Sequence, residues 1–248
     1  MCNASQMKTL YIPVLLSLML SSCSKDSNQE TKQLGAIHFE FRHQAGGDSL
    51  NFDNTFYTNA AGNEYRVSYL KYFISGVCLY QNGALIHKSK ARPTSINGKY
   101  LKYNNKLEQN IPVGKYDSIS FSMGIVPEYN WHDAFELNYN DLGMYWPIDL
   151  GGGYHFMKFE GHWKDGDDFG TFAFHLGNND NLLTVGFPYT QQIKDNITNH
   201  ITIVMDVNEW FDNPYLYDLT KEDGYTMGNG SQMQILVNNG RNVFSILH

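Results

Sequence analysis

The sequence predicts an all-β protein, built as an antiparallel β-sandwich of the immunoglobulin-like or jelly-roll type. Two observations lead to this fold class. Segments in which apolar and polar residues alternate recur along the chain, as expected for strands that bury one face. Tight-turn sequences separate these segments, and after the apolar N-terminal run no stretch has the 3.6-residue apolar period of a helix. Many short strands joined by tight turns are typical of a sandwich or an open barrel.

Residues 1–22 are predicted to be a lipoprotein signal peptide. Leu10–Leu20 is an apolar run that follows Lys8 and is too short to span a bilayer as a helix, which is typical of a secretory signal. The run ends in the letters LSSC, and small residues before a cysteine resemble the site cut by the lipoprotein signal peptidase. Cleavage would leave Cys23 as an acylated first residue whose lipid chains anchor the protein. Residues 23–35 are mostly polar and aperiodic, so they are predicted to be a tether.

Residues 36–248 are predicted to form a single domain, because no Pro- or Ser-rich break divides them. The formal charge of the chain is -7, and it becomes -8 when the one charged residue of the signal peptide, Lys8, is removed. Because no basic cluster accompanies this acidic balance, nucleic acid is excluded as a partner. Of the three cysteines, only Cys78 would remain unmodified in the mature chain, so the domain has no internal disulfide and relies on its core.

Three segments show the alternation of a strand most clearly. In AIHFEF, the apolar residues Ile37, Phe39 and Phe41 alternate with polar ones. The segments DSISFSM (117–123) and HITIVMDV (200–207) repeat the same period of two. Because side chains point alternately to opposite faces of a strand, each segment is expected to bury one row and expose the other.

Turn signals join these strands. The segments YQNGALI and LVNNGRNVFSIL both place Asn-Gly between apolar runs, which predicts a two-residue hairpin loop in each. GKYDS and HWKDGDDFGTF are expected to be further reversals. Short helical turns are expected only within TQQIKDNITNH and VNEWFDNPYLYDL.

The motifs of several enzyme and cofactor classes are absent from the sequence. It has no His-Glu-x-x-His, no Gly-x-Ser-x-Gly, no Walker loop, no dinucleotide fingerprint and no Cys-x-x-Cys-His. One loop holds four carboxylates, but nothing places two of them across a cleft as a glycoside hydrolase requires. Three aspartates in KDGDDFG are explained better by an Asp-Gly hairpin turn than by a calcium loop. The carboxylates are Glu128, Asp133, Glu136 and Asp141 in the loop, and Asp165, Asp167 and Asp168 in the turn. We therefore expect no enzymatic activity.

Three of the nine histidines are candidate metal ligands. His43 continues the inward row of its strand, and His175 ends a strongly apolar strand just before a loop. His132 lies in a loop between Trp131 and Asp133, and the Asp133 carboxylate could either hold the imidazole tautomer or cap a turn. A single histidine is more often structural than a ligand, so a site requires that these histidines converge. Imidazoles with methionine and tryptophan nearby favour copper over metals that prefer carboxylates.

Four segments of the chain, in this order, resemble the MbnP-like copper-binding protein family, which includes lipoproteins. The resemblance covers about Ala36 to Val207. Its most specific parts are the Trp-His-Asp loop, the stretch from Met-Tyr-Trp to Gly-Tyr-x-Phe-x-Lys-x-Glu-Gly, and the Phe-His-Leu-Gly strand end. The segments are FYTNAAGNEYRVSYLKYFISGVCLY, IPVGKYDSISFSMGI, VPEYNWHDAFELN with LGMYWPIDLGGGYHFMKFEG, and TFAFHLGN.

The resemblance implies an exported β-rich protein that binds copper, in some members through histidines and a tryptophan oxidised to kynurenine. It also implies a dihaem peroxidase-like partner, which is encoded beside several members. Position by position, His132, His175 and His43 match histidines of the family, and Trp146 matches the first tryptophan of its Met-aromatic-Trp motif. The second tryptophan that many members carry two residues later is absent here.

We therefore expect an exported, lipid-anchored protein that binds copper for acquisition or storage in the outer membrane of a Gram-negative bacterium, on its periplasmic or cell-surface face. A haem peroxidase-like protein is its expected partner. The predicted site residues are the ligands His132, His175 and His43, the neighbouring Trp131, Asp133, Met144 and Trp146, and the lipidated Cys23. The sequence leaves open a metal-free alternative, in which Trp131, Tyr145 and Trp146 form a contact surface for a glycan or a protein.

Overall fold

The computed structural model describes residues 32–100, 102 and 104–247. The predicted signal peptide, Cys23 and most of the predicted tether lie outside the described residues. The first strand begins at Leu34, within the last two positions of the predicted tether. Among the described residues, no helix is both long enough and apolar enough to cross a membrane.

The smaller of the two sheets in the described part of the chain has five strands, in the order β13-β12-β1-β2, and β7 also pairs with β1. Its pairs are antiparallel except β1 and β12, which run parallel with His38 opposite His200. The strands are β1 (Leu34–Ala45), β2 (Asp48–Ser49), β7 (Asn105–Pro112), β12 (Thr198–Asp206) and β13 (Phe244–Leu247).

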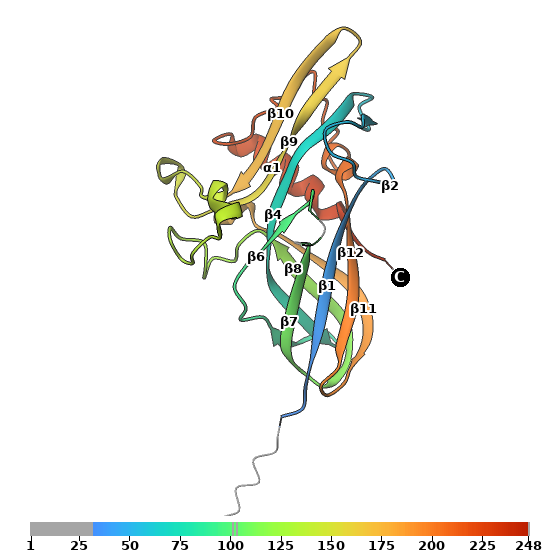
Figure 1. Ribbon diagram of the computed structural model, residues 1–248, viewed down its shortest axis with the longest axis vertical. Helices are drawn as coiled ribbons and strands as arrows, with labels where there is room; N and C mark the ends of the chain where they lie inside the picture. The colour runs from blue at the N-terminus through green and yellow to red at the C-terminus, as the bar shows by residue number, and fades with distance from the viewer. Residues whose placement is uncertain (1–31, 101, 103, 248) are drawn as a thin grey trace, which may run out of the picture. The chain divides into compact units, whose positions relative to one another are not determined.

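The larger sheet has eight described strands, in the order β10-β9-β4-β8-β11, with β3, β5 and β6 also pairing β4. The long β4 forms its centre, as Figure 1 shows. The strands are β3 (Tyr57–Thr58), β4 (Glu64–Gln81), β5 (Ala84–Lys88), β6 (Thr94–Asn97), β8 (Gly114–Met123), β9 (His155–Asp165), β10 (Asp168–Gly177) and β11 (Leu183–Ile193). All pairs in this sheet are antiparallel, so the predicted all-β sandwich is confirmed, with one parallel pair in the smaller sheet.

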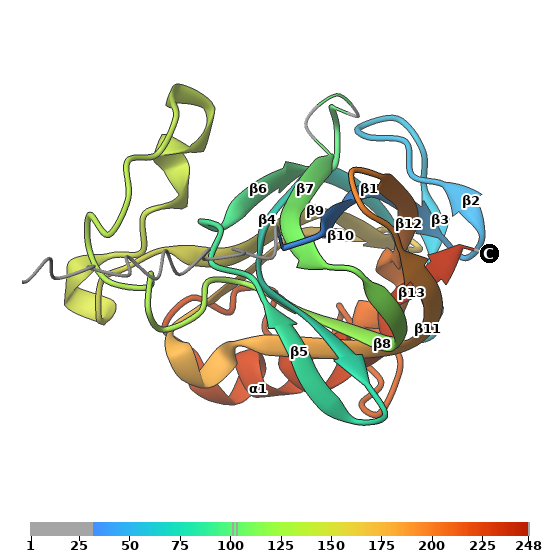
Figure 2. The ribbon, with the colours of Figure 1, turned by 90° about the horizontal axis from the view of Figure 1, so that it is seen from below.

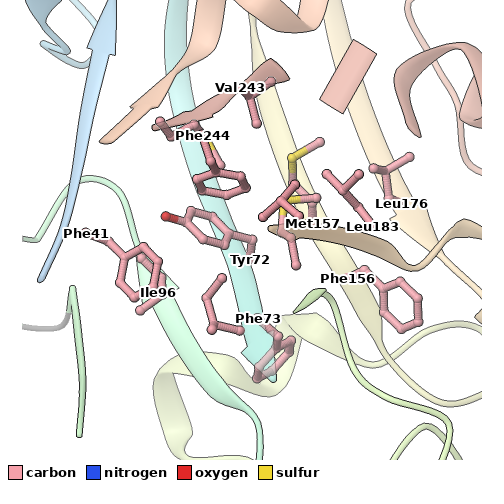
Figure 3. Close-up of a cluster of buried hydrophobic side chains, with 14 of the residues drawn as sticks. Phe41, Tyr72, Phe73, Ile96, Phe156, Met157, Leu176, Leu183, Val243 and Phe244 are labelled. Carbon is pink, nitrogen blue, oxygen red and sulfur yellow. The ribbon is translucent and has the colours of Figure 1, made fainter. Parts of the chain in front are cut away.

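The core lies between the two sheets and is rich in aromatic side chains. Figure 2 shows the strands of the two sheets facing one another, with the helix α1 (Gly230–Asn239) outside them. In Figure 3, Phe41 of the smaller sheet lies near Tyr72 of the larger one, and their ring centroids are 6.3 Å apart. Phe244 adds an edge contact to Tyr72, with centroids 6.0 Å apart. Each such side chain contributes about 1.5–3 kcal/mol when fully buried, so these rows hold the sheets together.

Several predicted turns are confirmed. Asn82 and Gly83 join β4 to β5 with φ angles of 49° and 77°, which is the left-handed conformation that an Asn-Gly hairpin requires. The reversal after Pro112 leads into β8, and Gly166 turns the chain from β9 into β10. The short 3-10 helix η5 (Val207–Phe211) lies within the segment VNEWFDNPYLYDL, as expected.

The predicted hairpin in LVNNGRNVFSIL is wrong. Its first four residues are the last four of α1, and the Asn-Gly pair stands at the C-terminal end of that helix. The helix begins where the Asn229 side chain accepts a hydrogen bond from the backbone of Gln232. Asn-Gly suits a helix end as well as a hairpin, because glycine is common just beyond a helix C-terminus. The segment Thr190–Ile193, where a helical turn was also considered, is the end of β11.

Candidate metal centre

The candidate site lies at one end of the larger sheet, where the chain leaves β10 and enters β9. Figure 1 shows the yellow-green segment that precedes β9 beside this end. The segment contains two short 3-10 helices, η2 (Tyr139–Met144) and η3 (Ile148–Leu150). Asn130 ties its first part in place, because its amide nitrogen donates to Asn179 Oδ1 (2.8 Å) and its amide oxygen accepts from Tyr154 N (3.1 Å).

The triple glycine reverses the chain just before β9. Gly151, Gly152 and Gly153 have φ angles of 112°, 68° and 82°, which residues with a Cβ rarely adopt. The reversal brings Tyr145 opposite Tyr154 in a single β-bridge. These three glycines therefore let the chain turn into β9.

Trp146 is a buried residue that packs against the site. Only 1% of the residue is exposed, and its indole nitrogen donates to the carbonyl of Leu150 (3.0 Å). The indole lies flush against Gly177 at the end of β10, where an added Cβ would come within 2.7 Å of Trp146 Cδ2. Trp146 also makes an edge contact with His155, with ring centroids 4.8 Å apart. The chain thus needs glycine at position 177 to accommodate the indole beside His155.

His155 is the most unusual polar group of the site. It is 5% exposed, and neither of its ring nitrogens has a hydrogen-bond partner in the described part of the chain. Burial lowers its pKa to about 3, and the neighbouring His175 and Lys158 act in the same direction. The backbone groups of Met144 and Tyr145 oppose this shift only partly, and their geometry falls short of hydrogen bonds. The ring is therefore neutral at pH 7, with a lone pair available as a metal ligand.

His175 provides a second imidazole beside the first. The ring centroids of His155 and His175 are 5.1 Å apart, and the rings are nearly perpendicular. His175 Nε2 lies 2.8 Å from Glu160 Oε1, and this hydrogen bond lowers the pKa of the Glu160 carboxyl. If Nε2 carries the proton donated to Glu160, then Nδ1 is left as the basic nitrogen, as in the carboxylate-histidine pairs that orient metal ligands. Glu160 thus acts as a positioning residue for His175.

His132 lies farther out, on the loop. Its side chain is 46% exposed, its ring contacts Tyr145 at a centroid distance of 5.5 Å, and its Nε2 lies 3.5 Å from Asp133 Oδ2. The neighbouring Trp131 is exposed, and its indole nitrogen donates to the carbonyl of Glu128. Among the described residues, no three His, Cys, Asp or Glu side chains converge as a possible metal site. The structure therefore does not join His132 and His175 in one cluster of that kind.

His43 lies on the opposite side of the larger sheet from His175. It is buried as its strand parity predicted, and its Nε2 lies 3.0 Å from the hydroxyl of Tyr72. In the sheet, Tyr72 pairs with Met157, which pairs with Leu176, so these three side chains share the inner face. His175 directly precedes Leu176 in β10, so its side chain points to the other face. His43 and His175 therefore do not meet, and burial lowers the pKa of His43 to about 4.

Two of the four loop carboxylates form ion pairs with lysine side chains, and the three turn aspartates are exposed. Asp141 Oδ1 lies 2.9 Å from Lys71 Nζ in a buried ion pair, and Glu128 pairs with Lys88 at 3.2 Å on the surface. The aspartates at positions 165–168 lie in the exposed turn between β9 and β10. These positions give no support to a hydrolytic acid pair or a calcium loop.

His155, Glu160 and Gly177 are the site residues that sequence reasoning missed. The available signal for His155 was its context, an imidazole between Tyr154 and Phe156 directly after the glycine reversal. Trp146 was predicted to lie beside His132, His175 and His43, and the structure shows it in contact with His155, which that set did not include. Met144 is buried, and its backbone lies close enough to influence the pKa of His155.

Comparison with known proteins gives two matches. A sequence model of the MbnP family matches residues 34–229. Among solved structures, the fold is similar to that of MbnP from Methylosinus trichosporium, with a TM-score of 0.58 and 11% sequence identity over 86% of this chain and 98% of that chain. At this identity the structural match shows a shared fold. A comparison with curated protein sequences gives no match.

Proposed function

The chain belongs to the MbnP family, and on this premise we propose that it binds copper, which it acquires or stores as an exported, lipid-anchored protein. The observation that carries the proposal is the pair formed by His155 and His175. One member is a buried, neutral imidazole without a hydrogen-bond partner among the described residues, and the other is oriented by a carboxylate. A buried polar group without a partner costs about 1–3 kcal/mol, so its retention calls for a ligand.

The spacing of the two rings fits one shared metal ion. Two imidazoles that bind a metal through bonds of about 2 Å at a near-tetrahedral angle have ring centres about 5 Å apart. The observed distance between the centroids of His155 and His175 is 5.1 Å.

The donor set favours Cu(I) over other metals. Cu(I) accepts low coordination numbers, so two neutral imidazoles at this bent angle and one further donor suffice for it, whereas zinc and calcium sites need more ligands. The described residues offer no third His, Cys, Asp or Glu at this position. The Trp146 indole shields one side of His155 from solvent, which disfavours water as an additional ligand.

A competition titration tests the proposal. The protein is loaded with Cu(I) in the presence of a chromophoric Cu(I) chelator, and the wild type is compared with His155→Ala, His175→Ala and His132→Ala. We expect one tightly bound equivalent in the wild type and in His132→Ala, and at least a hundredfold weaker binding in the other two. His132→Ala is the matched control, because it removes an exposed imidazole from the neighbouring loop. Tight, stoichiometric copper in the variant that lacks both His155 and His175 would overturn the assignment.

The location, the lipid anchor and the partner of the protein are proposed from sequence features alone. We propose that Cys23 carries the lipid anchor, that the protein resides at the outer membrane of a Gram-negative bacterium, and that a dihaem peroxidase-like protein is its partner. We also propose that the protein does not act as an enzyme. Mass spectrometry of the purified membrane fraction tests the anchor, because acylation of Cys23 adds the mass of its lipid chains.

A second candidate function is a metal-free binding module for glycans or proteins. It is favoured by the exposure of large apolar side chains on the segment before β9, where Trp131 is 57% and Tyr139 88% exposed. Trp146 does not belong to such a surface, because it is buried. Glycan binding that is lost in Trp131→Ala and insensitive to chelators would favour this candidate.

A further inference from the structure

A second pair of histidines lies on the smaller sheet, whereas His155 and His175 lie on the larger one. His38 of β1 and His200 of β12 are direct partners in the parallel register of these strands. Figure 1 shows the two strands side by side. Their neighbours Ile37, Phe39 and Ile201 are buried, whereas His38 is half-buried and His200 exposed. Because side chains alternate along a strand, both imidazoles belong to the outward-facing row of this sheet.

The two rings are spaced as ligands of one metal ion. Their centroids are 5.2 Å apart and their planes are tilted by 56°. This separation again fits two metal-nitrogen bonds of about 2 Å at a near-tetrahedral angle. Cross-strand partners on a sheet hold their Cβ atoms at a fixed distance, so the backbone itself sets the spacing of the pair.

The rings have no competing protein partner. Within the described part of the chain, neither the His38 side chain nor the His200 side chain makes a hydrogen bond or an ion pair, and the contact between their rings is the interaction observed. The nearest carboxylate along β1, Glu40, is two residues away and is held by Arg42 at 3.0 Å. Both imidazoles are therefore available to a metal ion, and water would complete its coordination.

We infer that His38 and His200 form a second, solvent-exposed metal site, which takes a divalent first-row transition metal and binds Cu(II) most tightly. Imidazole suits copper, nickel and zinc, and among divalent ions the affinity of a nitrogen site is highest for Cu(II). Two protein ligands leave open positions that exchange with solvent, so the site binds metal weakly and reversibly. The inference does not depend on the pair His155 and His175, which lies on the other sheet.

A Cu(II) titration of the mature chain tests this site. Cu(II) is added in competition with glycine, and electron paramagnetic resonance reports the number of nitrogen ligands. We expect one equivalent of Cu(II) with two imidazole nitrogens, and at least tenfold weaker binding in His38→Ala and in His200→Ala. His162→Ala is the matched control, because it removes an exposed histidine of β9, and its Cu(II) affinity should change less than twofold.

The same titration in the His155→Ala/His175→Ala background separates this inference from the proposed function. The expected result there is that the weak Cu(II) equivalent persists, whatever happens to the tight Cu(I) equivalent. Far-UV circular dichroism verifies that the surface variants are folded. The inference is overturned if the His38→Ala/His200→Ala double variant keeps the Cu(II) affinity and spectrum of the wild type, or if His162→Ala weakens binding equally.

Discussion

Replacing Gly177 by alanine should displace the Trp146 indole and so disturb the proposed copper site at His155. The added Cβ would lie 2.7 Å from Trp146 Cδ2 and also 2.7 Å from Cζ3, well inside ordinary contact distance. The backbone φ at this position is not in the left-handed region, so the cost comes from this contact and not from strain. Overpacking of a core costs about 1–3 kcal/mol. Loss of the hydrogen bond from the indole to Leu150 adds about 1 kcal/mol.

We therefore expect Gly177→Ala to lower the free energy of unfolding by about 2–4 kcal/mol, measured by urea denaturation. Because the indole contacts His155, Cu(I) affinity should fall as well. Gly186→Ala in β11 is the matched control, since its Cβ would meet its nearest atoms at 3.7 Å. Its stability should change by less than about 0.5 kcal/mol. If Gly177→Ala were as stable as this control, the role assigned to the Trp146 contact would be wrong.

Three further predictions concern stability. Asp141→Asn should lower the free energy of unfolding by about 3–5 kcal/mol, because it leaves the buried Lys71 charge without its ion-pair partner. The double variant Lys71→Met/Asp141→Leu removes both charges and should lower it by less. Equal losses for the two variants in urea denaturation would argue against a buried ion pair. Burial lowers the pKa of His43 to about 4, against about 6.5 in the unfolded chain, so its stabilising contribution is complete above pH 6.5 and is lost as the pH falls toward 4. This contribution is about 3 kcal/mol, and His43→Gln should remove that part of the pH dependence of unfolding; an unaltered dependence would contradict it. Asn229→Ala should cost about 1 kcal/mol by removing the cap of α1, and a change below about 0.3 kcal/mol would show that the cap is unimportant.

The strands and most of the turns could be predicted because their signals are local. Alternation over five or six residues identified β1, β8 and β12, and Asn82 with Gly83 specified its hairpin. The same Asn-Gly signal failed at Asn239 and Gly240, because the ten residues of α1 mix apolar and amide side chains too evenly to show a stripe. Whether that pair ends a helix or turns a hairpin is decided by contacts with η5 and β10, which are distant in sequence.

The candidate site was predictable only in part, because it depends on register. Strand parity placed His43 in the core, but it could not show that the Tyr72 side of the larger sheet faces away from His175. The rings of His155 and His175 come into contact because β9 pairs with β10 and because the register of this pairing shifts just after Leu176. Neither is encoded in a short motif.

The position of bound copper decides whether His155 and His175 are its ligands. A crystal of the Cu(I)-loaded protein, measured on both sides of the copper absorption edge, locates the metal by anomalous scattering. We predict one strong peak between the rings of His155 and His175, within about 2 Å of a nitrogen of each. A peak at His132 instead, or no peak near His155 in a crystal that contains stoichiometric copper, would contradict it.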